Sequence, residues 1–370
     1  MKILYSWGHH PVWARSIERE VADWRRAGHD VTSFNHRAFA GIPKFPKPDE
    51  LDALYRRRHP GLMGLYRKVE ELACEYDVLL VNHDTLYHPD FLSTLRGRIY
   101  TVLCSGDDPD ASEFCSKPYV SSFDHCFAWG VRFDENTTVA QKFLEWGAKR
   151  SDWWPYGVRP DAYDPQLTED DIRRVQRRVD VLYIGSAWAK ENRLVRLRRQ
   201  FGRRFKAYGN WGRLFPLKHG MWVRPVPVDQ LVQPYRNAKV GINIHLTFGP
   251  CNMRLYELPA NGVMQICDCA DGLGQVFEIG QEVVAYRTIE EAIAQIEYYD
   301  AHQDERIEIA VRGFRRVIKD YTRRQTFAQA VEKIKAGMHA DGILPKNESQ
   351  ADAVVVGATG NATAPSAGRR

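Results

Sequence analysis

The sequence has no long hydrophobic run. Its apolar stretches, such as residues 78–81, are only a few residues long, far short of the roughly 20 residues that a membrane-spanning helix needs. The N-terminus carries one lysine and a short apolar stretch, which ends in glycine and histidine before it could form the core of a signal peptide. We therefore expect a cytoplasmic protein without a membrane-spanning segment.

Paired cysteines are also missing. The seven cysteines are odd in number and scattered, and no two of them form a C-x-x-C pair. This pattern argues against a disulfide framework and against a zinc site, so we expect reduced and mostly buried thiols.

The glycine-rich loop of a dinucleotide-binding enzyme is absent as well. Residues 6–11 follow the first expected strand and read Ser-Trp-Gly-His-His-Pro instead of G-x-G-x-x-G. Because those glycines let the backbone approach a pyrophosphate, a nicotinamide or flavin enzyme is disfavoured. His9 or His10 could act as a general base or contact an acceptor from this loop. A histidine pair on a surface turn is an equally good interpretation.

Positive charge is modest overall but unevenly spread. The formal net charge is +5, and many arginines lie within residues 173–204. Such a cluster could face nucleic acid, a membrane surface or a phosphate-bearing ligand. Apolar residues interleave with these arginines, which favours solvated helix faces. We therefore expect no specific nucleic-acid partner, and weak association with an anionic membrane surface stays open.

Short apolar runs alternate with helical patterns along the chain, as a parallel sheet with crossover helices requires. The predicted fold class is therefore α/β with two Rossmann-like domains. In the first half we expect strands at 2–6, 29–34, 77–82, 98–104 and 125–129, with a helix at 13–27. Prolines in residues 40–60 predict a loop with one helical turn.

A second alternating set begins after the aromatic, Pro- and Gly-containing residues 153–160, which are typical of a linker. Its expected strands are 180–185, 205–208, 240–244, 263–267 and 282–286; its expected helices are 191–201, 229–237, 254–260 and a helical region over 288–338. The expected domains are 1–155 for the acceptor, 156–318 for the nucleotide-sugar donor, closing helices at 319–344 and a disordered tail at 345–370.

Three carboxylates follow the expected strand at 98–104, in Asp107, Asp108 and Asp110. We first expect helix capping by Asp107 or Asp108. A catalytic carboxylate on the acceptor side is the second interpretation. The third is a D-x-D metal site, since carboxylate oxygens suit Mg²⁺ or Mn²⁺.

The most informative stretch is a strand at 240–244 followed by a short helix that begins near Asn252. Unsatisfied amides at a helix N-terminus favour a diphosphate. Arg254 can add a bidentate phosphate contact, and Glu257 lies one turn further on the same face, where it can accept hydrogen bonds from ribose hydroxyls. A surface ion pair between Arg254 and Glu257 is the alternative explanation.

The run Asn252-x-Arg254-x-x-Glu257-x-x-Ala260-x-Gly262, followed by residues 268–282, resembles the donor-binding module of GT-B glycosyltransferases, closest to the CgeB-like group related to glycosyltransferase family 4. The strand and loop at 180–186, with Lys190 and Arg193, resemble the part of that module that contacts phosphates. The resemblance implies the donor-binding residues Gly185, Ser186, Lys190, Arg193, Val228, Asn243, Asn252, Arg254, Leu255 and Glu257.

The chain departs from family 4 in one respect. Those enzymes carry two glutamates eight positions apart, and here Gly249 stands where the first would fall. Because that glutamate lies near the reacting sugar in the family, the stereochemical outcome stays open.

Together these features predict a metal-independent glycosyltransferase that needs no cofactor. It would take a nucleotide-sugar donor and a small-molecule, glycan or other hydroxyl acceptor, with His9, His10, Asp107 or Asp108 as the catalytic groups. The alternatives are a nucleotide-sugar epimerase or hydrolase on the same fold, and a basic protein that binds nucleic acid or an anionic surface.

Overall fold

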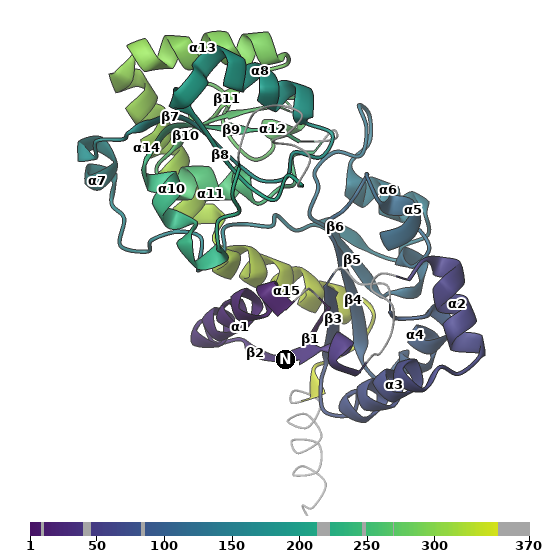
Figure 1. The fold of residues 1–370 in the computed structure, drawn as a ribbon. Helices are drawn as coiled ribbons and strands as arrows, with labels where there is room; N and C mark the ends of the chain where they lie inside the picture. Colours follow the sequence, from purple (N-terminus) through teal and green to yellow (C-terminus); the bar gives the residue numbers. More distant parts are fainter. Residues whose placement is uncertain are drawn as a thin grey trace, which may run out of the picture.

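Two parallel sheets, each with helices packed against it, form the two lobes of the molecule (Figure 1). The computed structural model describes residues 1–8, 11–39, 46–82, 86–212, 223–245, 249–268 and 270–346. None of the helices in these ranges combines the length and the apolar composition needed to cross a membrane. The six described cysteines are free thiols, and Cys269 lies outside the described residues.

The first sheet has the strand order β2-β1-β3-β4-β5-β6, and every strand pair in it is parallel. Side chains of β3 alternate between two cores, with Val78 and Leu80 on one face and Leu79 and Val81 on the other. A strand that is covered on both faces needs a continuous apolar run, so this strand could be predicted from the sequence. The strands are β1 Lys2–Trp7, β2 Asp30–Asn35, β3 Val78–Asn82, β4 Tyr100–Ser105, β5 His125–Ala128 and β6 Ser151–Trp153.

Most of the expected elements of the first domain are confirmed, with two corrections. Residues 40–60 were predicted to be a loop with one helical turn, but a nine-residue helix begins at Pro48. Proline at the first position of a helix loses no hydrogen bond, so Pro48 and Pro60 mark helix starts here. Strand β6 was not predicted, because its three half-buried residues carry no pattern. The helices are α1 Pro11–Arg26, α2 Pro48–Arg56, α3 Pro60–Leu72, α4 Pro89–Leu95, α5 Ser112–Cys115 and α6 Val139–Glu145.

The second sheet has the order β11-β10-β9-β7-β8, again with parallel pairs. Its order reverses between β7 and β9, and open α/β sheets bind ligands outside the strand ends at such a point. The predicted helices 191–201 and 254–260 are confirmed at both ends. The elements are α7 Glu169–Arg174, β7 Val179–Ile184, α8 Glu191–Phe201, β8 Phe205–Tyr208, α10 Val232–Arg236, β9 Ala238–Asn243, α11 Arg254–Ala260, β10 Met264–Cys267, α12 Ala270–Leu273 and β11 Val284–Ala285.

The predicted helical region after residue 288 consists of α13 Ile289–Ala301, α14 Gln303–Asp320 and α15 Arg323–Ala340. The last of these returns to the first domain and lies beside α1 (Figure 1). Phe327 of α15 stacks on Trp24 of α1 with ring centroids 3.9 Å apart. The first domain therefore takes part of its core from the end of the chain. The predicted disordered tail lies outside the described residues from 347 onward.

Candidate active site between the two domains

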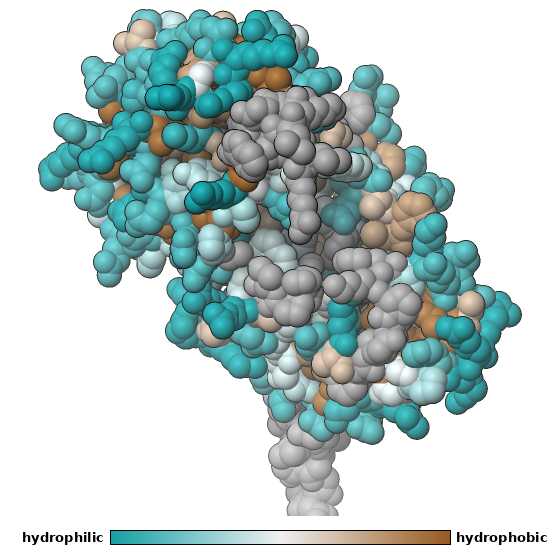
Figure 2. Space-filling view, viewed as in Figure 1, coloured by the Kyte–Doolittle hydropathy of each residue, from teal (hydrophilic) through white to brown (hydrophobic). Residues whose placement is uncertain are grey.

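A pocket of about 640 Å³ lies between the two domains and takes residues from both. On the first-domain side it is lined where strands end: Asn82 closes β3, Gly106 follows β4, and Trp129 follows β5. Cys251, Asn252 and Met253, just before α11, and Trp188, after β7, come from the second domain. Strand ends of the first sheet therefore face the start of α11 across one cavity. The coloured outer surfaces of the two lobes in Figure 2 are mostly hydrophilic.

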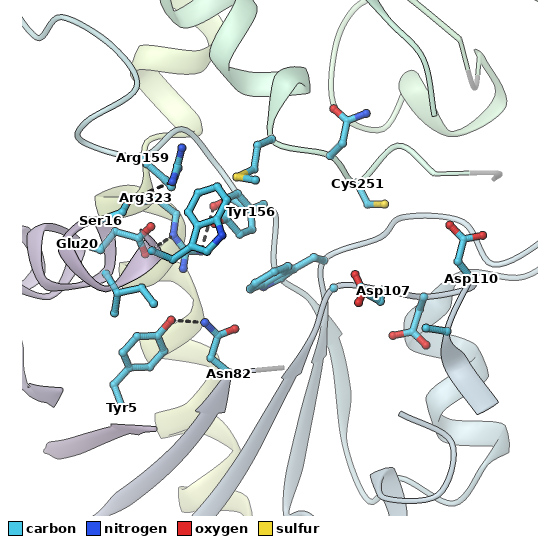
Figure 3. Close-up of a pocket in the computed structure, with 18 of the residues that line it drawn as sticks. Tyr5, Ser16, Glu20, Asn82, Asp107, Asp110, Tyr156, Arg159, Cys251 and Arg323 are labelled. Atoms are coloured by element: carbon cyan, nitrogen blue, oxygen red, sulfur yellow. Dashed lines mark hydrogen bonds and ion pairs between the residues drawn. The ribbon is translucent and has the colours of Figure 1, made fainter. Parts of the chain in front are cut away.

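One end of the pocket contains a buried ion pair among aromatic rings (Figure 3). Arg323 donates from Nε to Glu20 at 3.0 Å, and both side chains are at most 3% exposed. The guanidinium also donates to the Tyr156 carbonyl and lies 4.6 Å from the centre of that ring. Because a buried charge is costly without a partner, this arrangement ties α15 to α1 at the pocket wall.

A second buried arginine joins the two domains. Arg159 donates to Ser16 of α1 at 3.0 Å and lies over the Trp13 ring at 4.8 Å. Its Nη2 also contacts Glu257 of α11 at 3.4 Å. Arg159 thus connects the pocket wall on α1 to the predicted donor side.

Asp108 and Asp107 have different surroundings. Asp108 is buried and accepts hydrogen bonds from the hydroxyls of Ser105, Ser112 and Ser116 at 2.5–2.6 Å. Asp107 is exposed and lines the pocket, as does Asp110. The expected capping by Asp107 or Asp108 is wrong. The N-cap of α5 is Ala111, and no described side chain caps that helix.

Some predicted residues cannot be placed. His9 and His10 lie outside the described residues, and the side chain of Val228 is not described. In the sequence the two histidines follow β1, whose last residue pairs with Asn82 at the end of β3.

Arg254 is held by the ends of two strands. Its Nη1 donates to the Ile184 carbonyl at 2.5 Å, and its Nη2 donates to the Ile244 carbonyl at 3.1 Å. The guanidinium lies 4.6 Å from the centre of the Tyr183 ring. A Cβ at position 185 would overlap Arg254, so Gly185 is needed for this close approach. The guanidinium therefore supports the strand ends and places its charge where the sheet order reverses.

Asn243 and Asn252 connect Arg254 to the pocket. The Asn243 Oδ1 accepts from Arg254 Nε at 3.2 Å and from the Asn252 side chain at 2.8 Å. Asn252 Oδ1 in turn accepts from the backbone amide of Leu255 at 3.1 Å. Asn243 is fully buried, so it acts by positioning its neighbours, whereas Asn252 reaches the pocket.

Glu257 is buried, with 4% exposure. One carboxylate oxygen accepts from the Tyr235 hydroxyl at 2.7 Å, and the other contacts Arg159 at 3.4 Å. Glu257 therefore faces the inside of the molecule and is not part of a solvated surface pair with Arg254. Its expected contact with a ribose stays a prediction.

Lys190 and Arg193 add positive charge beside Arg254. Burial, together with the charges of Arg254 and Arg193, lowers the pKa of Lys190 to about 8. Arg193 contacts Asp268 at 3.2 Å and the His245 carbonyl at 3.1 Å. The loop in front of Lys190 turns through Ser186, whose exposed hydroxyl accepts from the Trp188 amide at 3.0 Å. The predicted phosphate-binding residues thus gather at one place.

One group in the described ranges has metal-ligand chemistry. The ligand atoms of His245, Cys267 and Asp268 lie within 4.8 Å of one another. Burial lowers the pKa of His245, which keeps its imidazole neutral. Burial opposes ionisation of Asp268, but the His245 hydrogen bonds and the charge of Arg193 outweigh it and lower the Asp268 pKa. Asp268 is therefore ionised, and the positive charge of Arg193 already balances its negative charge.

The arginine cluster is partly neutralised by neighbouring acids. Arg173 pairs with Glu308 at 3.0 Å, and Arg204 contacts Asp300 at 3.3 Å. Arg177 donates hydrogen bonds to backbone carbonyls, including that of Gly262 at 2.6 Å. These contacts agree with solvated and structural roles for much of the cluster.

Several pocket residues were not identified from the sequence. Arg323 and Glu20 are 303 residues apart, and no local pattern connects them. Arg159 stands in the stretch that was interpreted only as a linker. Burial raises the pKa of Cys251 to about 12, so its pocket-lining thiol is protonated near neutral pH. The other residues that were missed are Tyr5, Trp13, Ser16, Ile17, Asn82, Ala111, Trp129, Tyr156, Trp188 and Met253.

Comparison with known proteins supports the fold. Residues 170–332 match the family described as "Glycosyl transferase-like". HepE from Anabaena, solved with UDP-glucose, has a TM-score of 0.60 at 14% identity, over 91% of this chain and 100% of that chain. Sucrose-phosphate synthase from Thermosynechococcus elongatus has a TM-score of 0.61 at 12% identity, over 92% and 100%.

A putative UDP-N-acetylglucosamine 2-epimerase from Listeria monocytogenes has a TM-score of 0.55 at 11% identity, over 93% of this chain and 97% of that chain. The search among curated proteins finds no match. Identities this low establish the fold alone. The chain therefore has the GT-B fold, two Rossmann-like domains facing across a cleft, and residues 170–332 form a glycosyltransferase-like domain.

Proposed function

We propose that this protein transfers a sugar from a nucleotide-diphosphate sugar to a hydroxyl group of an acceptor. The observation that carries the proposal is the position of the 640 Å³ pocket. It lies between exposed carboxylates of the first domain and the start of α11, where its lining residue Asn252 is joined through Asn243 to the predicted phosphate-binding Arg254. HepE and its UDP-glucose complex share this fold, which supports a nucleotide sugar as the donor.

The donor-side residues would stabilise the leaving diphosphate. Transfer of the sugar leaves negative charge on the nucleotide, and fixed positive charge in a partly buried site lowers the energy of that state by several kcal/mol. Lys190 is buried but has no described carboxylate partner at ion-pair distance. Binding of a diphosphate would supply that counter-charge. Arg193 and Arg254 keep their protein contacts and contribute through their charge.

The acceptor-side base would be Asp107. Asp107 is exposed and lines the pocket, whereas Asp108 is buried. His9 and His10 remain proposed alternatives, since their loop follows the adjacent strand β1. The proposal includes the CgeB-like assignment and a reaction that needs no metal. Lysine and arginine side chains would take the place that a divalent cation has in other transferases.

Thermal melting with UDP, GDP and dTDP sugars tests the donor site, because a ligand that binds the folded state raises its stability. We expect one nucleotide to raise the melting temperature of the wild type and of Lys206→Met, in which an exposed lysine on β8 is replaced. Lys190→Met should lose most of that shift. An equal shift in Lys190→Met would remove Lys190 from the donor site.

Product analysis distinguishes the second candidate function, which the fold match to a 2-epimerase favours. Transfer gives a glycosylated acceptor and a nucleoside diphosphate. Epimerisation gives a changed nucleotide sugar without any acceptor, and its detection would overturn the transferase proposal.

A further inference from the structure

The acceptor side of the pocket carries no excess positive charge in the described part of the chain. Its acidic side chains outnumber its basic ones. Both guanidiniums are matched by acids, with Arg323 on Glu20 at 3.0 Å and Arg159 on Glu257 at 3.4 Å. The acidic lining residues are Glu20, Asp107, Asp108 and Asp110, and the basic ones are Arg159 and Arg323.

A phosphorylated acceptor would therefore be poorly accommodated. A bound phosphate needs positively charged hydrogen-bond donors that are not already paired with carboxylates. To bind it, Arg323 or Arg159 would have to leave a buried acid without its counter-charge, which is strongly unfavourable. The two arginine–carboxylate pairs therefore favour an uncharged acceptor.

Several aromatic rings also line the pocket. Trp13 and Trp129 line the pocket half-exposed, and the Trp129 ring packs edge-on against Tyr156 with centroids 4.5 Å apart. Trp188 reaches in from the second domain and is 72% exposed. Such rings bind flat apolar molecules by offset stacking and edge contacts. A pocket of about 640 Å³ is in the size range of sites that hold drug-sized molecules.

The two ends of the pocket differ. Figure 3 shows Arg323, Glu20 and Tyr156 at one end, and Asp107 and Asp110 facing Cys251 at the other. A molecule with an apolar ring and one hydroxyl can place its ring along the aromatic wall and its hydroxyl toward the carboxylates.

Building on the sugar-transfer proposal, we propose that the acceptor is an uncharged aromatic alcohol whose ring packs against Trp13, Trp129 and Trp188 and whose hydroxyl faces Asp107. The hydroxyl oxygen forms a bond to the anomeric carbon of the donor sugar. The bond from that carbon to the diphosphate breaks, and the nucleoside diphosphate leaves with the electron pair. The hydroxyl proton goes to the Asp107 carboxylate.

Calorimetric titration of the full chain with 2-naphthol and with 2-naphthyl phosphate, without donor, tests this inference. The two probes share one ring system and differ in charge. We expect 2-naphthol to bind at least about tenfold more tightly, which corresponds to about 1.4 kcal/mol. Trp188→Ala should weaken 2-naphthol binding about fivefold or more by loss of stacking. Tyr298→Ala should leave it unchanged, since Tyr298 is equally an exposed aromatic residue but lies on α13.

Melting shifts with UDP, GDP and dTDP sugars on the same preparation report the donor site separately. Binding of one of these nucleotide sugars without binding of 2-naphthol would overturn the acceptor class and leave sugar transfer standing. Equal or tighter binding of 2-naphthyl phosphate, or binding of methyl glucoside in place of 2-naphthol, would overturn the acceptor class too. Absence of binding for all three nucleotide sugars and for 2-naphthol would overturn both proposals.

Discussion

The proposed role of Lys190 in donor binding predicts a dependence of donor affinity on pH. Burial and the neighbouring arginines lower the pKa of Lys190 to about 8, so in the free protein the lysine loses its proton as the pH rises through 8. A diphosphate favours the charged form and raises the pKa. Binding above pH 8 must therefore take up a proton, and the affinity is full near pH 7 and falls as the pH increases.

The size of this fall in affinity follows from the Lys190 pKa of about 8. If the protonated form binds, the apparent dissociation constant scales with one plus the ratio of neutral to charged Lys190. Between pH 7 and pH 9 this factor rises about tenfold, or about 1.4 kcal/mol. A nucleotide sugar is the proper ligand, because its diphosphate lacks the terminal phosphate that titrates near pH 6 in a monoester.

Calorimetric titration at pH 7 and pH 9 measures this change, and buffers of different ionisation enthalpy report the proton uptake. Lys190→Met should bind more weakly at pH 7 and show little dependence on pH, whereas Lys206→Met should keep the wild-type slope. The same slope in Lys190→Met, or a flat profile in the wild type, would refute the assignment of Lys190 to the diphosphate.

Three substitutions separate structural from catalytic roles, and removal of metal ions tests whether the reaction needs one. Glu20→Gln should lower the free energy of unfolding in urea by about 3–5 kcal/mol, because the Arg323 charge stays buried without its carboxylate partner. Adding Arg323→Met should recover most of that loss. An unchanged urea midpoint in Glu20→Gln would argue against the ion pair. Asp108→Ala should cost about 3 kcal/mol by leaving serine hydroxyls unsatisfied. Asp107→Asn should fold normally but lower kcat about 10²- to 10⁴-fold, and wild-type turnover would exclude it as the base. Prolonged treatment with EDTA should leave sugar transfer unchanged, and restoration by Mg²⁺ or Mn²⁺ after a loss would contradict a metal-independent reaction.

Local patterns predicted the framework well because parallel strands and amphipathic helices follow from short-range spacing. Residues 191–201 and 254–260 were predicted with the bounds that the structure has. Prolines misled the interpretation of residues 40–60, since Pro48 begins a helix there. The three-residue strand β6 carried too little pattern to be seen.

The site was predictable only in part, for a physical reason. Lys190, Arg193 and Arg254 follow strand ends of one sheet, so their grouping could be inferred from the order of elements. Arg159 and Arg323 form the pocket wall through contacts with distant residues. Glu257 is 98 residues from Arg159, and Glu20 is 303 residues from Arg323. A single sequence read by periodicity does not connect such distant pairs.

The structure of the protein with an intact nucleotide sugar and 2-naphthol would locate both proposed substrates at once. We expect the diphosphate beside Lys190 and the anomeric carbon about 3–3.5 Å from the acceptor hydroxyl, inside the pocket between the domains. A nucleotide bound elsewhere, or an anomeric carbon out of reach of that pocket, would contradict the proposed sugar transfer.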